Sequence, residues 1–139
     1  MKRSLSFICV GLLGICSLFS LVAGGTKQPG DSSQLPPAST KKDVSFERDV
    51  KPLLDRSCVD CHGAQKPKAG WRCDTKEALL KSKKQFLKGG DSANSLLIYD
   101  ISPVSDKAPW MPPRKKSNYP PLSREEIGIV RAWIDQGAK

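Results

Sequence analysis

The sequence is poor in the residue on which most catalytic and metal sites depend. Its 139 residues contain a single histidine, His62. A Ser-His-Asp triad could be built only with that histidine, and a His-Glu-x-x-His zinc site cannot be formed at all. Strand patterns and internal repeats are also absent. These absences argue against the common hydrolase and zinc-protease classes.

Methionine and aromatic residues are scarce as well. The two methionines are Met1 and Met111, and aromatic residues make up 6% of the chain against 38% for all hydrophobic residues. A core built from so few large side chains is modest for a small domain. Met1 belongs to a segment that we expect to be removed, so Met111 is the one thioether expected in the mature chain.

The single histidine stands directly after a pair of cysteines. Cys58, Cys61 and His62 form the pattern Cys-x-x-Cys-His, which is the attachment site of a c-type haem. The two thiols bond to the porphyrin and the imidazole binds the iron from the proximal side. We therefore predict one covalent haem c, and a haem held by two histidines of this chain is excluded.

Two other uses of the motif remain open. A zinc ion could take Cys58, Cys61, Cys73 and His62 as ligands, although adjacent Cys61 and His62 are awkwardly placed to face one tetrahedral ion. A thiol-redox site also uses Cys-x-x-Cys, but it requires a strand-to-helix context that the sequence does not indicate. Cys73 is otherwise expected to be a small buried apolar residue, with an intermolecular disulfide as its alternative.

Met111 is the candidate for the second axial ligand of the iron. It lies between Pro109-Trp110 and Pro112-Pro113, and prolines fix their own φ and disfavour helix in the preceding residue. A stiff loop is thus expected to present the sulfur. Alternatively, Met111 is a buried core residue or an exposed loop residue. The sixth position of the iron would then be taken by a lysine or stay open to small molecules.

The N-terminus has the features of an export signal. Lys2 and Arg3 precede an apolar run over residues 7–22, and small residues near position 24 offer a cleavage site. We predict a signal peptide over residues 1–25, with an uncleaved membrane anchor as the alternative. Cys9 and Cys16 match lipid-attachment sites poorly. The expected location is exported and periplasmic, free or membrane-tethered.

Residues 26–43 are rich in Pro, Ser, Gln, Lys and Gly and predict a flexible linker. The formal net charge of the whole chain is +9, which favours a redox partner with an acidic docking surface; nucleic acid is not expected for an exported protein. Basic clusters at 81–84 and 114–116 are candidate docking sites, with ordinary solvated surface as the alternative.

From residue 44 onward the patterns are helical. Asp49 is expected to cap a helix that leads into Cys58, with Pro52 in its first turn. Thr75 is expected to cap a helix over residues 76–80, and Ser92 or Asn94 to open another that ends at Ile101. A proline-rich loop is expected over residues 102–122.

The final helix has the clearest signals. Ser123 and Glu126 form a capping box, Ile127, Val130, Trp133 and Ile134 share one face, and Gly137 stands where a helix would end. The chain is therefore predicted to be all-α, with three to five helices wrapped around the haem.

The predicted elements follow the order found in a small class I cytochrome c. Residues 46–138 resemble the planctomycete-type cytochrome c domain. The matching segments are 46–54, 58–63, 69–72, 89–90, 95–97, 111–113 and 122–138. The sequence departs from the family in a shorter stretch after Gly90 and in Cys73, where an apolar residue such as leucine is usual.

The resemblance implies a cytochrome c domain over residues 44–139, haem c binding, and an electron-transfer role rather than an enzymatic one. It assigns the thioethers to Cys58 and Cys61 and the iron ligands to His62 and Met111. Trp71 and Arg72 are further candidates for contacts with the porphyrin edge and a propionate. The alternative function is a haem-based sensor or peroxidase-like enzyme with an open sixth site, for which no distal histidine exists.

Overall fold

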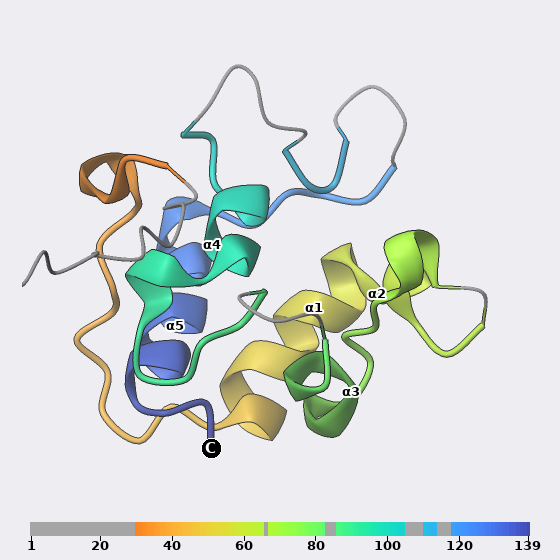
Figure 1. Ribbon diagram of the computed structural model, residues 1–139, viewed down its shortest axis with the longest axis horizontal. Helices are drawn as coiled ribbons and strands as arrows, with labels where there is room; N and C mark the ends of the chain where they lie inside the picture. The colour runs from red at the N-terminus through yellow and green to blue at the C-terminus, as the bar shows by residue number, and fades with distance from the viewer. Residues whose placement is uncertain (1–29, 66, 83–85, 105–109, 114–117) are drawn as a thin grey trace, which may run out of the picture.

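The structure is a computed structural model that describes residues 30–65, 67–82, 86–104, 110–113 and 118–139, and these residues form helices and loops without strands (Figure 1). The prediction of an all-α domain is confirmed. In chain order the elements are η1 (Ser32–Gln34), η2 (Phe46–Val50), α1 (Lys51–Ser57), α2 (Val59–His62), η3 (Lys68–Gly70), α3 (Lys76–Leu80), η4 (Ser92–Asn94), α4 (Leu96–Ile101) and α5 (Arg124–Asp135). Across the described residues, no helix has the length and hydropathy needed to cross a membrane.

The helical stretch that leads into the cysteine motif begins four residues earlier than predicted. Ser45, not Asp49, is the N-cap, because its side chain accepts a hydrogen bond from the backbone N–H of Arg48. Asp49 instead accepts from the backbone N–H of Ser45 at 2.9 Å. The two residues thus close a reciprocal cap over the π-helical turn η2, which continues into α1. Pro52 lies in the first turn of α1, as expected.

The middle of the chain forms short helices. The Thr75 side chain caps α3 by accepting from the backbone N–H of Ala78 at 3.1 Å, as predicted. The stretch predicted to open at Ser92 or Asn94 is divided. Asp91 caps the 3-10 turn η4, and α4 then begins after Ser95.

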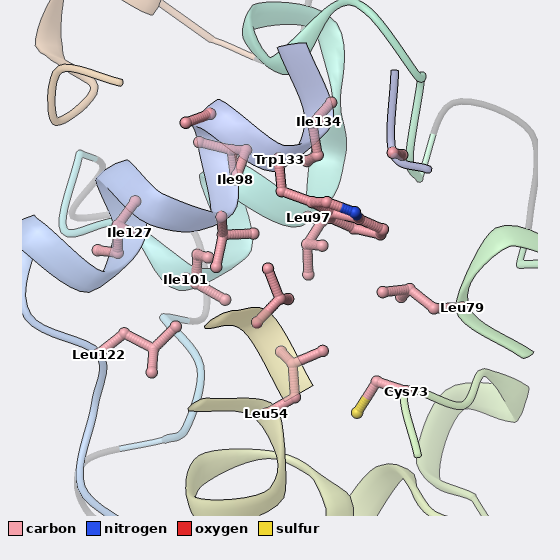
Figure 2. Packing of buried hydrophobic residues seen from close by; sticks show 14 of the residues in the cluster. Leu54, Cys73, Leu79, Leu97, Ile98, Ile101, Leu122, Ile127, Trp133 and Ile134 are labelled. Carbon is pink, nitrogen blue, oxygen red and sulfur yellow. The ribbon is translucent and has the colours of Figure 1, made fainter. Parts of the chain in front are cut away.

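Helix α5 packs its apolar face into the centre of the protein (Figure 2). Both halves of the Ser123–Glu126 capping box are present, and all four residues predicted for the apolar face are buried. The Trp133 ring lies 5.3 Å from that of Phe46, between centroids. Gly137 adopts φ +96°, and the N–H groups of Gly137 and Ala138 bond to the carbonyls of Ile134 and Trp133. This is a Schellman end, which favours glycine.

Residues 30–43 were predicted to belong to a flexible linker, but they are packed on the protein. Leu35 and Pro36 are buried, Arg131 donates to the carbonyl of Pro36, and Ser39 N–H donates to the carbonyl of Gly128 at 2.9 Å. A Cβ at Gly128 would lie 2.7 Å from the carbonyl oxygen of Pro37, so the close approach requires glycine there. Composition missed this because two apolar side chains and a few backbone bonds anchor the whole segment. Residues 26–29 and the predicted signal lie outside the described residues.

Candidate haem site

The cysteine motif lies where α1 passes into α2. Cys58 interrupts the helix with φ −129° and ψ −38°, and the N–H of His62 bonds back to the carbonyl of Cys58 at 2.9 Å. Residues three and four positions apart share one face of a helical turn. The spacing of the motif therefore presents Cys58, Cys61 and His62 to the same side, and all three border one cavity.

That cavity has a volume of about 310 Å³ and is lined by segments far apart in the sequence. The motif, the loop around η3, α4 and the Met111 segment all contribute to its wall. Its lining residues are Ser57, Cys58, Cys61, His62, Lys68, Ala69, Trp71, Leu97, Asp100, Ile101, Met111, Pro112, Pro113 and Tyr119. Most of these are apolar or aromatic, as is usual for sites that bury a cofactor.

His62 is buried, with 7% of its surface exposed. Its ring stacks on Trp71, with 3.8 Å between centroids and 19° between planes. Burial is the main cause that lowers the pKa of His62, so the neutral imidazole that can bind a metal is favoured at neutral pH. Its Nδ1 atom is buried without a hydrogen-bond partner.

The Met111 segment is attached to α4 at two points. The N–H of Met111 donates to the carbonyl of Asp100 at 2.7 Å, and the indole N–H of Trp110 donates to the carbonyl of Ile101 at 3.0 Å. These bonds use carbonyls at the C-terminal end of α4, which the helix itself leaves unpaired. Met111 is consequently held at the cavity wall, together with Pro112 and Pro113.

The structure separates the two further candidates. Trp71 lines the cavity, and its ring also contacts Phe86 at 4.5 Å between centroids. Arg72 does not belong to the lining, and its guanidinium forms a bidentate ion pair with Asp74 at 2.6 and 2.9 Å. A contact between Arg72 and a haem propionate thus remains a prediction that this arrangement does not favour.

Four polar residues of the cavity wall were missed by the sequence analysis. They are Ser57, Lys68, Asp100 and Tyr119. Lys68 Nζ lies 3.2 Å from the Cys61 Sγ, burial raises the pKa of Asp100, and a hydrogen bond with Asp60 raises that of Tyr119. Asp100 could have been noticed in the sequence, because it is a lone carboxylate among the apolar residues of α4. The positions of the other three residues depend on the paths of the loops, which the sequence does not indicate.

Cys73 is fully buried, as expected for a small apolar residue. Among the described residues the cysteines Cys58, Cys61 and Cys73 carry free thiols, and no group of three or more potential metal-binding side chains forms there. The four-ligand zinc alternative therefore gains no support. The basic clusters fall largely on residues 83–85 and 114–117, which lie outside the described residues.

The residues present fit a covalently held haem. Three buried side-chain polar atoms of the described residues have no hydrogen-bond partner, and two of them, Ser57 Oγ and His62 Nδ1, belong to residues that line the cavity. Buried polar groups are normally paired. These two atoms of the cavity wall have no partner within the described protein, which is expected where a ligand completes a site. Two thiols, an imidazole and a thioether around one apolar cavity are the donor set of a c-type haem.

The fold and the site define an all-α domain with a c-type haem motif in the wall of its cavity. Residues 58–115 match the family model of planctomycete cytochrome C. The resemblance to the planctomycete-type cytochrome c domain is thereby confirmed over a segment that includes both the cysteine motif and Met111. At the level of the family, this indicates a haem-binding electron carrier. No curated protein and no solved structure was found to match the chain.

Proposed function

We propose that the protein is an exported monohaem c-type cytochrome that carries one electron and holds its iron between His62 and Met111. One observation carries the proposal. The cavity that borders Cys58, Cys61 and His62 is also bordered by Met111, which is remote in sequence. Since Met111 is the single methionine after Met1, it is the thioether available for the iron.

Each residue of the motif has a distinct role. When bound, a haem supplies a ferric/ferrous couple, so one electron enters or leaves without transfer of a chemical group. The sulfur atoms of Cys58 and Cys61 would hold the porphyrin through thioethers. The imidazole of His62 and the sulfur of Met111 would bind the iron, and a methionine ligand raises the potential.

The surrounding residues restrict the motion of the two proposed iron ligands. Trp71 stacks on the His62 ring and is itself supported by Phe86, which fixes the plane of the imidazole. The loop of Met111 is attached to the end of α4 by its bond to Asp100. Ligands held rigidly in one position need little rearrangement when the charge of the site changes, and this favours electron transfer over substrate chemistry.

The partner that we propose is a redox protein with an acidic docking surface. The chain carries a formal net charge of +9, and opposite charges accelerate association at low ionic strength. Within the described residues, Lys68 is the lysine at the cavity wall, beside Cys61. Export to the periplasm rests on the N-terminal signal, and membrane association would follow if that segment were retained.

The test compares optical spectra of oxidised and reduced full-length protein produced with a cytochrome c maturation system. Met111→Ala is compared with Leu80→Ala, an apolar residue of α3 that is 45% exposed and does not line the cavity. We expect the parent and Leu80→Ala to show a covalent low-spin haem with the weak far-red iron–sulfur band. Met111→Ala should lose that band.

Other outcomes would redirect the assignment. A high-spin parent, or a Met111→Ala spectrum identical to that of the parent, would remove Met111 as ligand and favour a sensor or peroxidase-like function with an open sixth site. Failure of haem attachment in the parent would overturn the proposal and make zinc analysis the next step. Charge steering is tested separately, by the ionic-strength dependence of reduction by an acidic redox protein.

A further inference from the structure

Asp100 is the one acidic residue among the described residues that line the haem cavity. It shares that lining with two other residues of α4, Leu97 and Ile101. Positions 100 and 101 follow Leu97 by three and four residues, which is the spacing that places side chains on one face of a helix. Leu97 and Ile101 are 1% and 2% exposed. The Asp100 side chain therefore belongs to the face of α4 that is turned towards the interior and the cavity.

The Asp100 carboxylate has no partner within the described residues. None of the ion pairs found there includes it, and neither does any side-chain hydrogen bond. Asp91, at the cap of η4, is by contrast paired with Lys88 at 2.7 Å. The lysine of the cavity wall, Lys68, has its Nζ atom 3.2 Å from the Cys61 sulfur. The cavity wall thus holds a carboxylate whose charge the described protein does not neutralise.

A carboxylate withdrawn from water is costly unless a positive charge lies nearby. Burial is the cause that raises the pKa of Asp100, and no neighbouring cation opposes that effect. A haem in the cavity would supply the opposite charge, since ferric iron carries one positive charge more than ferrous iron with the same ligands. A negative charge in the wall then favours the ferric state, and the interaction is stronger in a site of low dielectric constant than in water.

We propose that Asp100 lowers the reduction potential of the haem, because its carboxylate stabilises the ferric iron. The inference rests on the proposed function. One electron converts ferric to ferrous iron, and no bond is formed or broken. Asp100 acts against the thioether of Met111, which raises the potential. The backbone carbonyl of Asp100 also accepts the Met111 N–H at 2.7 Å, so the main chain of this residue holds the ligand loop while its side chain supplies the charge.

The test measures the midpoint potential of the full-length haem-loaded protein at pH 8, about four units above the ordinary pKa of an aspartate. Asp100→Asn removes the charge but keeps the size of the side chain and the backbone carbonyl that Met111 uses. At a fixed applied potential, the ratio of ferrous to ferric protein should rise at least about threefold. This is about 28 mV, since tenfold corresponds to about 59 mV for one electron. A smaller rise, or a fall, would overturn the inference.

Two further variants separate the charge in the cavity from charge elsewhere. Asp100→Glu restores the carboxylate and should bring the ratio back towards that of the parent. Glu77→Gln removes an exposed carboxylate of α3 that does not line the cavity, and it should change the ratio less than Asp100→Asn does. The difference between parent and Asp100→Asn should persist at about 1 M salt, which screens exposed charges beyond about 3 Å. Equal effects of Asp100→Asn and Glu77→Gln, or no recovery in Asp100→Glu, would contradict a specific charge at Asp100.

The iron–sulfur band distinguishes a failure of this inference from a failure of the proposed function. If all variants show the band and their potentials are equal, the electron carrier stands and the role of Asp100 falls. If the parent lacks the band but the Asp100 difference persists, ligation by Met111 falls and the role of Asp100 stands. Loss of the band in Asp100→Asn alone would mean that the side chain acts through the ligand loop rather than by its charge. If no haem attaches to the parent, both proposals fall.

Discussion

The region around α5 and the region around the cavity differ in how completely the protein satisfies its own groups. At α5, Trp133 is fully buried and its indole N–H donates to the carbonyl of Lys139 at 3.1 Å. At the cavity, His62 Nδ1 and Ser57 Oγ are buried without partners. In the α5 region the indole N–H is paired within the polypeptide. The cavity keeps two buried polar atoms unpaired, as is expected of a ligand-binding site.

This difference separates stability from function along the chain. The α5 region and the segment of residues 30–43 packed on it hold the fold, whereas Cys58, α2 and the Met111 segment present the donor groups. Substitutions in the first region should therefore change the free energy of unfolding and leave the haem spectrum unaltered. Substitutions at the cavity should alter the haem spectrum and change the free energy of unfolding less, and the following predictions test that division.

The largest effect is expected from Trp133→Ala in the haem-loaded protein. Loss of a fully buried indole that packs on Phe46 should lower the free energy of unfolding by about 3–5 kcal/mol. Urea denaturation followed by circular dichroism measures it, with the optical spectrum of the folded protein as the second observable. A changed iron–sulfur band in the folded variant would contradict the division.

The next effect concerns the segment before residue 44. Leu35 is 5% exposed, so Leu35→Ala should lower the free energy of unfolding by about 2–4 kcal/mol. Lys42→Ala, at an exposed position of the same segment, serves as the control and should have little effect. If the two variants were equally stable, residues 30–43 would act as the linker that composition predicts.

A smaller change in stability is expected at the cavity. Trp71→Leu removes the rings' contacts with His62 and Phe86 and should cost about 1 kcal/mol of unfolding free energy. The same variant should shift the reduction potential and the ligand band, because the imidazole loses its stacking support. Trp133→Ala is the matched comparison: it is the larger loss of stability and should leave both spectroscopic signatures in place.

The smallest effect is at a contact between the two regions, where Arg56 of α1 pairs with Glu126 of α5 at 2.9 Å. The hydrogen bond from Arg56 is the main cause that lowers the pKa of Glu126 below 4.5. The contribution of the Arg56–Glu126 pair to the free energy of unfolding is therefore present above pH 4.5. It is lost as the pH falls through the lower pKa that Glu126 has in the folded state.

Glu126→Gln keeps a residue that suits the capping box but removes this titration. The loss of stability between pH 7 and pH 3 should shrink by less than about 1 kcal/mol, as is typical of a partly exposed pair. Urea denaturation of the parent and of Glu126→Gln at both pH values measures this difference. An unchanged profile in Glu126→Gln would mean that the pair does not link the two regions.

Local signals explain which parts of the fold could be predicted. The caps at Thr75 and Ser123 and the end at Gly137 depend on a few adjacent residues, and the structure bears them out. The start of the first helix was assigned to Asp49 because a carboxylate is a good N-cap. The reciprocal bond between Ser45 and Asp49 uses the same carboxylate from inside the helix, and residue types alone do not distinguish the two arrangements.

By itself, the sequence determined the chemistry of the motif. Cys58, Cys61 and His62 share a face because of helical spacing, and scarcity singles out Met111 as the candidate thioether. Only the tertiary structure decided that Met111 reaches the same cavity, that Lys68 and Asp100 line it, and that the N–H of Cys73 bonds to the carbonyl of His62. Those relations depend on where loops return to the core, and side-chain packing across long sequence separations sets them.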